Sequence, residues 1–186
     1  MKKIIIFASG SGTNAENIIK HFNLSTIGIV ISVFTNNLNA KVIDRAKKFQ
    51  VPTTVFTKDE LFESKVLHKL NLLEPDLIVL AGFLLKFPES IVQTYPNKII
   101  NIHPALLPKY GGKGMYGINV HKAVVENKEK ETGITIHFVN ENYDEGNIIF
   151  QAKTALSGTE TPEEVAEKIH ELELNHFPLV IEKLLT

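Results

Sequence analysis

"KIIIFASGSGTN", residues 3–14, joins a continuous apolar run to a glycine-rich loop, and this junction predicts the architecture of the chain. The run over residues 3–8 is almost entirely apolar, which is typical of a strand buried on both faces of a sheet. The loop over residues 8–14 leads into a helical pattern over residues 13–22. A buried strand, a short glycine loop and a helix together form the opening unit of a parallel α/β sheet.

The same alternation of strand and helix continues for about a hundred residues. Further strands are expected at residues 26–36, 53–56, 76–82 and 97–103, and further helices at 39–49, 59–73 and 88–95. Because the strand runs are rich in Ile, Val and Leu, we expect helices to cover both faces of the sheet. The repetition predicts a Rossmann-like α/β fold, a mostly parallel, doubly wound sheet with right-handed crossovers.

The pattern changes after residue 116. A short helix over residues 118–127 precedes two strand-like runs, 132–140 and 147–156, which the acidic loop "ENYDEG" connects. They predict an antiparallel hairpin added to the sheet near the C-terminus. A last helix is expected to begin at "TPEE", with Thr161 as N-cap and Glu164 completing a capping box. Since no repeat, linker or low-complexity tract interrupts residues 1–186, we expect a single domain.

Composition excludes several classes of function. Lys and Arg number 20 against 21 acidic residues, a net charge of −1, which argues against nucleic-acid binding through broad phosphate contact. The chain has no cysteine, so disulfides, thiolate zinc sites and a cysteine nucleophile are excluded. The apolar run over residues 4–8 is shorter than that of a secretory signal, and no segment approaches the ~20 apolar residues of a membrane span. A cytoplasmic protein is therefore expected.

In an open parallel sheet, ligands bind beside the carboxyl ends of strands, where the loop over residues 8–14 begins. Its glycines allow close approach of the backbone, and amides at a helix N-terminus bind anions. The loop matches neither the dinucleotide pattern G-x-G-x-x-G nor a nucleotide P-loop with its Lys, so a monophosphate fits better than a pyrophosphate. A tight turn without any ligand would explain the same residues equally well.

Asn101 and His103 end another strand, in "NIHP". Alternation along a strand points both side chains to the same side. A turn-capping amide and a packed histidine would need no function, but the pair on one face favours an oxyanion site, because both groups can donate to a developing negative charge. Nothing in the spacing of His121 and His137 resembles a zinc site, and both are expected to be structural.

Two other loops leave the same edge of the predicted sheet. The apolar loop "AGFLLKF", residues 81–87, is either plain core or the lining of a slot for a flat ring. The hairpin loop over residues 141–147 needs no function to explain it, but its Asp144 could hold a nearby imidazole protonated. Together these parts suit direct transfer of a group to a bound nucleophile through a tetrahedral intermediate.

"NIHPALLPKY", residues 101–110, followed by Asp144 in a D-x-G hairpin, resembles the formyltransferases that use 10-formyltetrahydrofolate. The resemblance covers nearly the whole chain. "GSGTN" (10–14), "PDLIVLAGF" (75–83) and the length are similar to the members that formylate glycinamide ribonucleotide in purine biosynthesis. The resemblance implies a cytoplasmic enzyme, monomeric or weakly dimeric, with these two small molecules as substrates and no metal, nucleic acid or membrane as partner.

The resemblance also implies roles for individual residues. Asn101 and His103 correspond to the catalytic pair, and Asp144 to the carboxylate that raises the pKa of the histidine. Residues that correspond to the glycinamide ribonucleotide site are Gly12, Thr13, Asn14, His170 and Glu173. Residues that correspond to the folate pocket are Leu84, Leu85, Lys86, Phe87, Asn101, Asn140, Glu141, Asn142, Tyr143 and Asp144.

The chain departs from the family pattern at three places, one of which is the lack of a clear match for a basic residue that the family often carries near position 59, where Lys58 is a weak candidate. Many members carry an Arg in the folate loop where this chain has Leu85 followed by Lys86. The glycine-rich segment over residues 111–117 is longer than the common version and is expected to be a mobile flap near the folate entrance.

Four other readings remain open at this point. Formyltransferases acting on methionyl-tRNA or nucleotide sugars, and formyltetrahydrofolate hydrolases, usually carry additional domains. A sensor that binds a phosphorylated sugar through residues 10–14 would not need the catalytic residues. An unrelated nucleotide-binding α/β domain would leave the "NIHP" pair and Asp144 unexplained.

Overall fold

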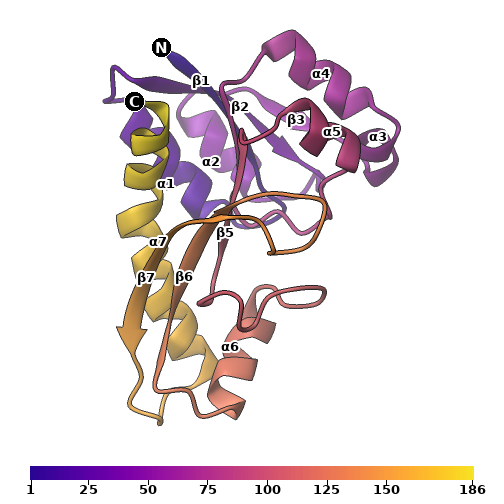
Figure 1. The fold of residues 1–186 in the computed structure, drawn as a ribbon. Helices are drawn as coiled ribbons and strands as arrows, with labels where there is room; N and C mark the ends of the chain where they lie inside the picture. The colour runs from indigo at the N-terminus through magenta and orange to yellow at the C-terminus, as the bar shows by residue number, and fades with distance from the viewer.

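Seven strands form one sheet in the order β3-β2-β1-β4-β5-β6-β7 in the computed structural model, which describes residues 1–186 (Figure 1). The strands are β1 (Lys2–Phe7), β2 (Gly28–Thr35), β3 (Thr53–Val55), β4 (Leu77–Leu80), β5 (Ile99–His103), β6 (Glu131–Phe138) and β7 (Ile148–Ala155). The helices are α1 (Thr13–Phe22), α2 (Val42–Lys48), α3 (Lys58–Phe62), α4 (Lys65–Leu73), α5 (Glu89–Thr94), α6 (Ile118–Glu126) and α7 (Pro162–Leu185).

The direction of the strands confirms the predicted fold class. β1 to β5 pair in parallel, whereas β6 is antiparallel to β5 and to β7, as expected for a hairpin added near the C-terminus. β1 lies between β2 and β4, so the strand order reverses there. The carboxyl ends of β1 and β4 therefore flank the crevice in which open α/β sheets bind ligands.

Helices cover both faces of the sheet, and each face has its own apolar core. In β1, Ile4 and Ile6 belong to the core beneath α1, α2, α6 and α7, while Ile5 and Phe7 belong to the core beneath α3, α4 and α5. All four side chains are fully buried. The alternation of one strand between two cores explains the continuous apolar run that opens the sequence.

The helices follow the sequence pattern closely, with one exception. α7 begins with the predicted capping box of Thr161 and Glu164. The single helix expected over residues 59–73 is instead two helices, because Ser64 adopts a left-handed conformation with φ of 68° that a continuing α-helix does not allow. No helix combines the length and apolar character that crossing a membrane requires.

Candidate active site

A cavity of about 660 Å³ opens at the carboxyl ends of the parallel strands. Its walls come from the loop after β1, the loop after β4, the end of β5, the segment before α6, the loop after β6 and the middle of α7. Fifteen predicted site residues line it: Gly12, Thr13, Asn14, Leu84, Leu85, Lys86, Phe87, Asn101, His103, Asn140, Asn142, Tyr143, Asp144, His170 and Glu173. Glu141 is exposed and does not line the cavity.

The antiparallel pairing of β5 with β6 holds in place the strand end that carries Asn101 and His103. Asn101 lies opposite His137, and His103 lies opposite Thr135. The Thr135 hydroxyl donates to the carbonyl oxygen of Ala105 at 2.6 Å and accepts from the amide of Leu107 at 3.0 Å. The chain that leaves β5 is therefore fixed by a side chain of the neighbouring strand.

His103 is almost completely buried, and one ring nitrogen is already engaged. Its Nε2 lies 2.7 Å from the carbonyl oxygen of Tyr110, which can only accept, so Nε2 carries the proton. Nδ1 faces Oδ2 of Asp144 at 3.6 Å. Burial lowers the pKa of His103, and the charge of Asp144 and the bond to Tyr110 oppose that effect without overcoming it. Asp144 thus acts in the predicted direction, but His103 is neutral at pH 7 and suited to accept a proton.

Asp144 lies at the tip of the loop after β6, with a left-handed φ of 55°. Its Oδ2 accepts a hydrogen bond from the Gly112 amide at 2.9 Å, and its Oδ1 lies 3.6 Å from Nε2 of His137. Burial raises the pKa of Asp144, but the hydrogen bond from Gly112 and the neighbouring His103 oppose burial, and the pKa lies below its usual value. An ionised carboxylate therefore stands between two imidazoles.

His137, expected to be structural, belongs to the site. Its Nδ1–H donates to the carbonyl oxygen of Phe138 at 2.8 Å, which leaves Nε2 to accept from Nδ2 of Asn101 at 3.1 Å. One N–H of the Asn101 amide is thus fixed by the protein, and the other is left for a ligand. The sequence carries no local signal for this contact, because it depends on the register between β5 and β6.

The N-terminus of α1 forms one end of the cavity. Its N-cap, Gly12, has a left-handed φ of 73°, and no side chain caps the helix. The backbone amides of residues 11–14 donate to no other part of the protein. Free amides at a helix N-terminus favour an anion such as a phosphate monoester.

Beside this helix end, α1 and α7 bring three polar side chains together. Nδ2 of Asn14 donates to Oε2 of Glu173 at 2.7 Å, and Nδ1 of His170 lies 3.4 Å from the same oxygen. Glu173 raises the pKa of His170, and burial opposes this effect more weakly. The carboxylate of Glu173 is thus available for a cationic or hydrogen-bond-donating group next to the anion site.

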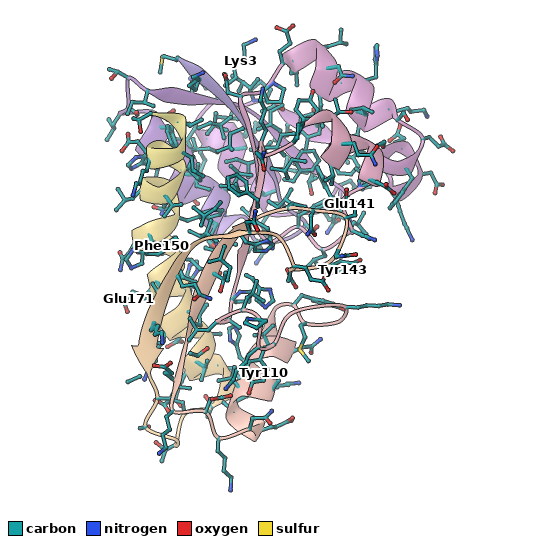
Figure 2. The ribbon with its side chains drawn as sticks, viewed as in Figure 1. Lys3, Tyr110, Glu141, Tyr143, Phe150 and Glu171 are labelled. Atoms are coloured by element: carbon teal, nitrogen blue, oxygen red, sulfur yellow. The ribbon has the colours of Figure 1, made fainter.

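The opposite end of the cavity lies between the loop after β4 and the loop after β6. The Lys86 ammonium stands 5.9 Å from the centre of the Tyr143 ring and joins the two loops. Phe87 anchors the loop after β4 to the core, since its side chain is buried and packs edge-on against Phe7. Figure 2 shows Glu141 and Tyr143 on the second loop, above the segment that carries Tyr110. The slot between the loops suits a flat, partly apolar ligand.

His121 on α6, which was expected to be structural, also lines the cavity. It is 5% exposed, and its Nδ1 has no hydrogen-bond partner. Burial lowers the pKa of His121, and nearby Glu173 opposes this effect. Its place in the site follows from the packing of α6 against α7 and not from any motif.

Comparisons with known proteins agree with this arrangement. The model of the formyl transferase family matches residues 2–181. The chain is 36% identical to the phosphoribosylglycinamide formyltransferase of Bacillus subtilis, over 100% of this chain and 95% of that protein. It is 40% identical to the chloroplastic phosphoribosylglycinamide formyltransferase of Arabidopsis thaliana, but it spans only 60% of the plant protein. A solved glycinamide ribonucleotide transformylase 1 from Geobacillus kaustophilus has a TM-score of 0.91 and 34% identity over the whole of both chains.

Proposed function

The chain belongs to the formyl transferase family, and on that premise we propose that it transfers the formyl group of 10-formyltetrahydrofolate to the amine of glycinamide ribonucleotide. The observation that carries the proposal is the convergence of Asn101, His103 and Asp144 on a cavity that has an anion site at one end and a loop-lined slot at the other. The relatives' names give the same acceptor, phosphoribosylglycinamide, and the same transferred group.

In this proposal the α1 N-terminus binds the phosphate of the ribonucleotide, and Glu173 binds its amine. The amides of residues 11–14 and the carboxylate of Glu173 lie at the same end of the cavity, as a molecule with a phosphate and an amine requires. The amine must be neutral to attack, and a hydrogen bond to Glu173 would orient its lone pair toward the formyl carbon.

The folate ring would occupy the slot between residues 84–87 and 140–144. The exposed apolar surface of Leu84 and the ring of Tyr143 give that slot an apolar wall. Lys86 supplies a positive charge in the first of these loops. Glu141 is not part of this lining, so we propose no contact from its side chain.

The reaction begins when the amine nitrogen attacks the formyl carbon and the carbonyl oxygen becomes an oxyanion in a tetrahedral intermediate. The free N–H of Asn101 donates to that oxygen. The proton leaving the amine passes to Nδ1 of His103, directly or through a water molecule, because Nδ1 carries no hydrogen in the neutral ring. Asp144 stabilises the imidazolium formed, and the proton is then returned to the folate nitrogen as the carbon–nitrogen bond breaks.

We further propose that residues 1–186 act as one formyltransferase domain, as a monomer or weak homodimer in the cytoplasm. The single sheet with one core on each face supports one domain. Its substrates in this proposal are the two small molecules, without nucleic acid or metal.

A folate absorbance assay tests the proposal. The protein is mixed with 10-formyltetrahydrofolate in the presence and absence of glycinamide ribonucleotide. We expect tetrahydrofolate to appear only when the ribonucleotide is present. Release without the ribonucleotide would mean a hydrolase, and no release in either mixture would contradict formyl transfer to this amine.

A further inference from the structure

Arg45, the only arginine in the chain, lies outside the predicted site but contacts the anion loop directly. Its Nε donates to the carbonyl oxygen of Ser11 at 2.8 Å, and its guanidinium forms an ion pair with Glu16 in the first turn of α1. Glu16 also pairs with Lys20 at 2.9 Å. One side chain of α2 thus joins the loop and the helix on either side of Gly12.

α2 contacts the same loop at two further points. The Val42 amide donates to the carbonyl oxygen of Gly10 at 3.3 Å. The Val42 side chain packs so closely against Gly12 that a Cβ atom built there would lie 2.4 Å from Cγ2 of Val42. The N-terminus of α2 and Arg45 therefore form a continuous support behind residues 10–12.

This support determines which way the loop amides point. In a planar trans peptide, the C=O of one residue and the N–H of the next point in opposite directions. Since the carbonyl groups of Gly10 and Ser11 both point at α2, the amides of Ser11 and Gly12 point away from it. Neither amide donates to another part of the protein, and both residues line the cavity.

We propose that Arg45 is a positioning residue for phosphate binding, which holds the carbonyl group of Ser11 so that the amides of the anion loop face the phosphate of the ribonucleotide. The inference rests on the proposed function, because the phosphate is that of the proposed substrate. The charge of Arg45 also reaches this end of the cavity. Glu173 raises the pKa of His170, and the positive charge of Arg45 acts in the opposite direction and lowers that pKa.

Three variants separate positioning from charge and from general stability. Arg45→Gln removes both the charge and the fork that joins Ser11 to Glu16. Arg45→Lys keeps the charge but loses the planar guanidinium. Lys47→Gln, on an exposed position of the same helix, removes one charge without touching the loop and is the matched control.

Affinity is measured by calorimetry for two ligands: glycinamide ribonucleotide and the same nucleoside without its phosphate. We expect Arg45→Gln and Arg45→Lys each to weaken binding of the ribonucleotide about tenfold, the loss of roughly one hydrogen bond to an ion. In the Arg45 variants we expect changes of no more than about twofold in the affinity for the nucleoside, in the KM for the folate and in kcat at saturation. In Lys47→Gln, all of these quantities and the affinity for the ribonucleotide should stay within the same limit.

Three results would overturn the inference: unchanged ribonucleotide affinity in Arg45→Gln, full restoration by Arg45→Lys, or an equal loss for the nucleoside. A wild-type protein that does not bind the ribonucleotide would instead overturn the proposed function, so the two failures are distinguishable. If Arg45→Gln does not fold, Glu16→Gln provides the test, because it removes the ion-pair partner that orients the guanidinium and leaves the arginine charge in place. Glu16→Gln should weaken binding of the ribonucleotide more than binding of the nucleoside. If the variant binds both ligands as tightly as the wild type does, the inference is overturned.

Discussion

Oδ2 of Asp144 lies 3.6 Å from Nδ1 of His103, the ring nitrogen that no hydrogen bond of the protein occupies. The carboxylate is ionised and shielded from solvent, so its charge acts on the imidazole with little screening. The pair is therefore suited to stabilise a proton that arrives at His103 during the reaction, although burial keeps the resting ring neutral.

Asp144→Asn should reduce turnover and move the pH profile. Burial lowers the pKa of His103 and Asp144 raises it, so removing the carboxylate lowers that pKa further. Because neutral His103 is the active form in the proposed mechanism, the acid limb of kcat should move to lower pH. The plateau should fall by about 10² or more, because the imidazolium loses its partner. Glu145→Gln, an exposed neighbour in the same loop, is the control, and an acid limb that stays in place or moves to higher pH would contradict the proposed role.

His103→Ala should lose on the order of 10²–10³ in turnover, within the range typical of a positioned general base that also returns the proton. The protein should remain folded, because the strand pairing around residue 103 is made by the backbone. His176→Ala removes an imidazole that packs against the ring of Phe150 outside the cavity and should leave turnover nearly unchanged. Near-normal turnover of the His103 variant would contradict the assignment.

The fold was predictable because its signals are local. A strand that alternates between two cores, such as β1, must be apolar throughout, and the capping box at Thr161 lies within four residues. The sequence did not predict the break at Ser64, because this residue adopts a left-handed backbone conformation although no glycine or proline lies next to it.

The site was predictable only in part, for the same physical reason. Asn101 and His103 lie on one strand, so alternation alone places them together. The contacts of His137 and Arg45 depend on strand register and on the packing of α2, which join residues far apart in the sequence. Long-range contacts of this kind have no short motif.

Glu173→Gln should weaken ribonucleotide binding by about tenfold, because a hydrogen bond to a charged acceptor is replaced by one to a neutral amide. The KM for the folate should stay unchanged. Glu171→Gln, on the outer side of α7, is the matched control (Figure 2). A proportional rise in the KM for the folate would mean that Glu173 supports the whole cavity and not the amine alone.

The same variant should lower the pKa of His170, which NMR titration of its ring protons would measure. Glu173 raises that pKa in the folded protein, so the pair stabilises the fold fully below the unfolded pKa of about 6.5. The stabilisation is lost as the pH rises through the folded pKa. An unshifted titration of His170 in Glu173→Gln would contradict the pairing.

Gly133→Ala should destabilise the hairpin of β6 and β7. A Cβ atom at this position would lie 2.0 Å from the backbone oxygen of Ala152, which cannot move without disturbing the strand pairing. Overpacking of this kind costs about 1–3 kcal/mol, and thermal unfolding should shift downward by several degrees. Gly10→Ala is the comparison, since no atom lies within 4 Å of its added Cβ. Equal unfolding temperatures for the two variants would contradict the packing argument.

The segment over residues 111–117 should close over bound folate. The segment lines the cavity, and its Gly112 amide donates to Asp144 in the loop after β6. A ligand in the slot therefore contacts both Gly112 and Asp144. Three of its glycines, Gly112, Gly114 and Gly117, have positive φ, and the segment belongs to no helix or strand. Hydrogen exchange should therefore be fast there in the free protein and slower with bound tetrahydrofolate, while β6 stays protected throughout.

Glycinamide ribonucleotide alone should have a smaller effect, because its proposed site lies at the other end of the cavity. Exchange that is slow in the free protein, or unchanged by the folate, would mean that this segment is a fixed wall of the cavity and does not act as a flap.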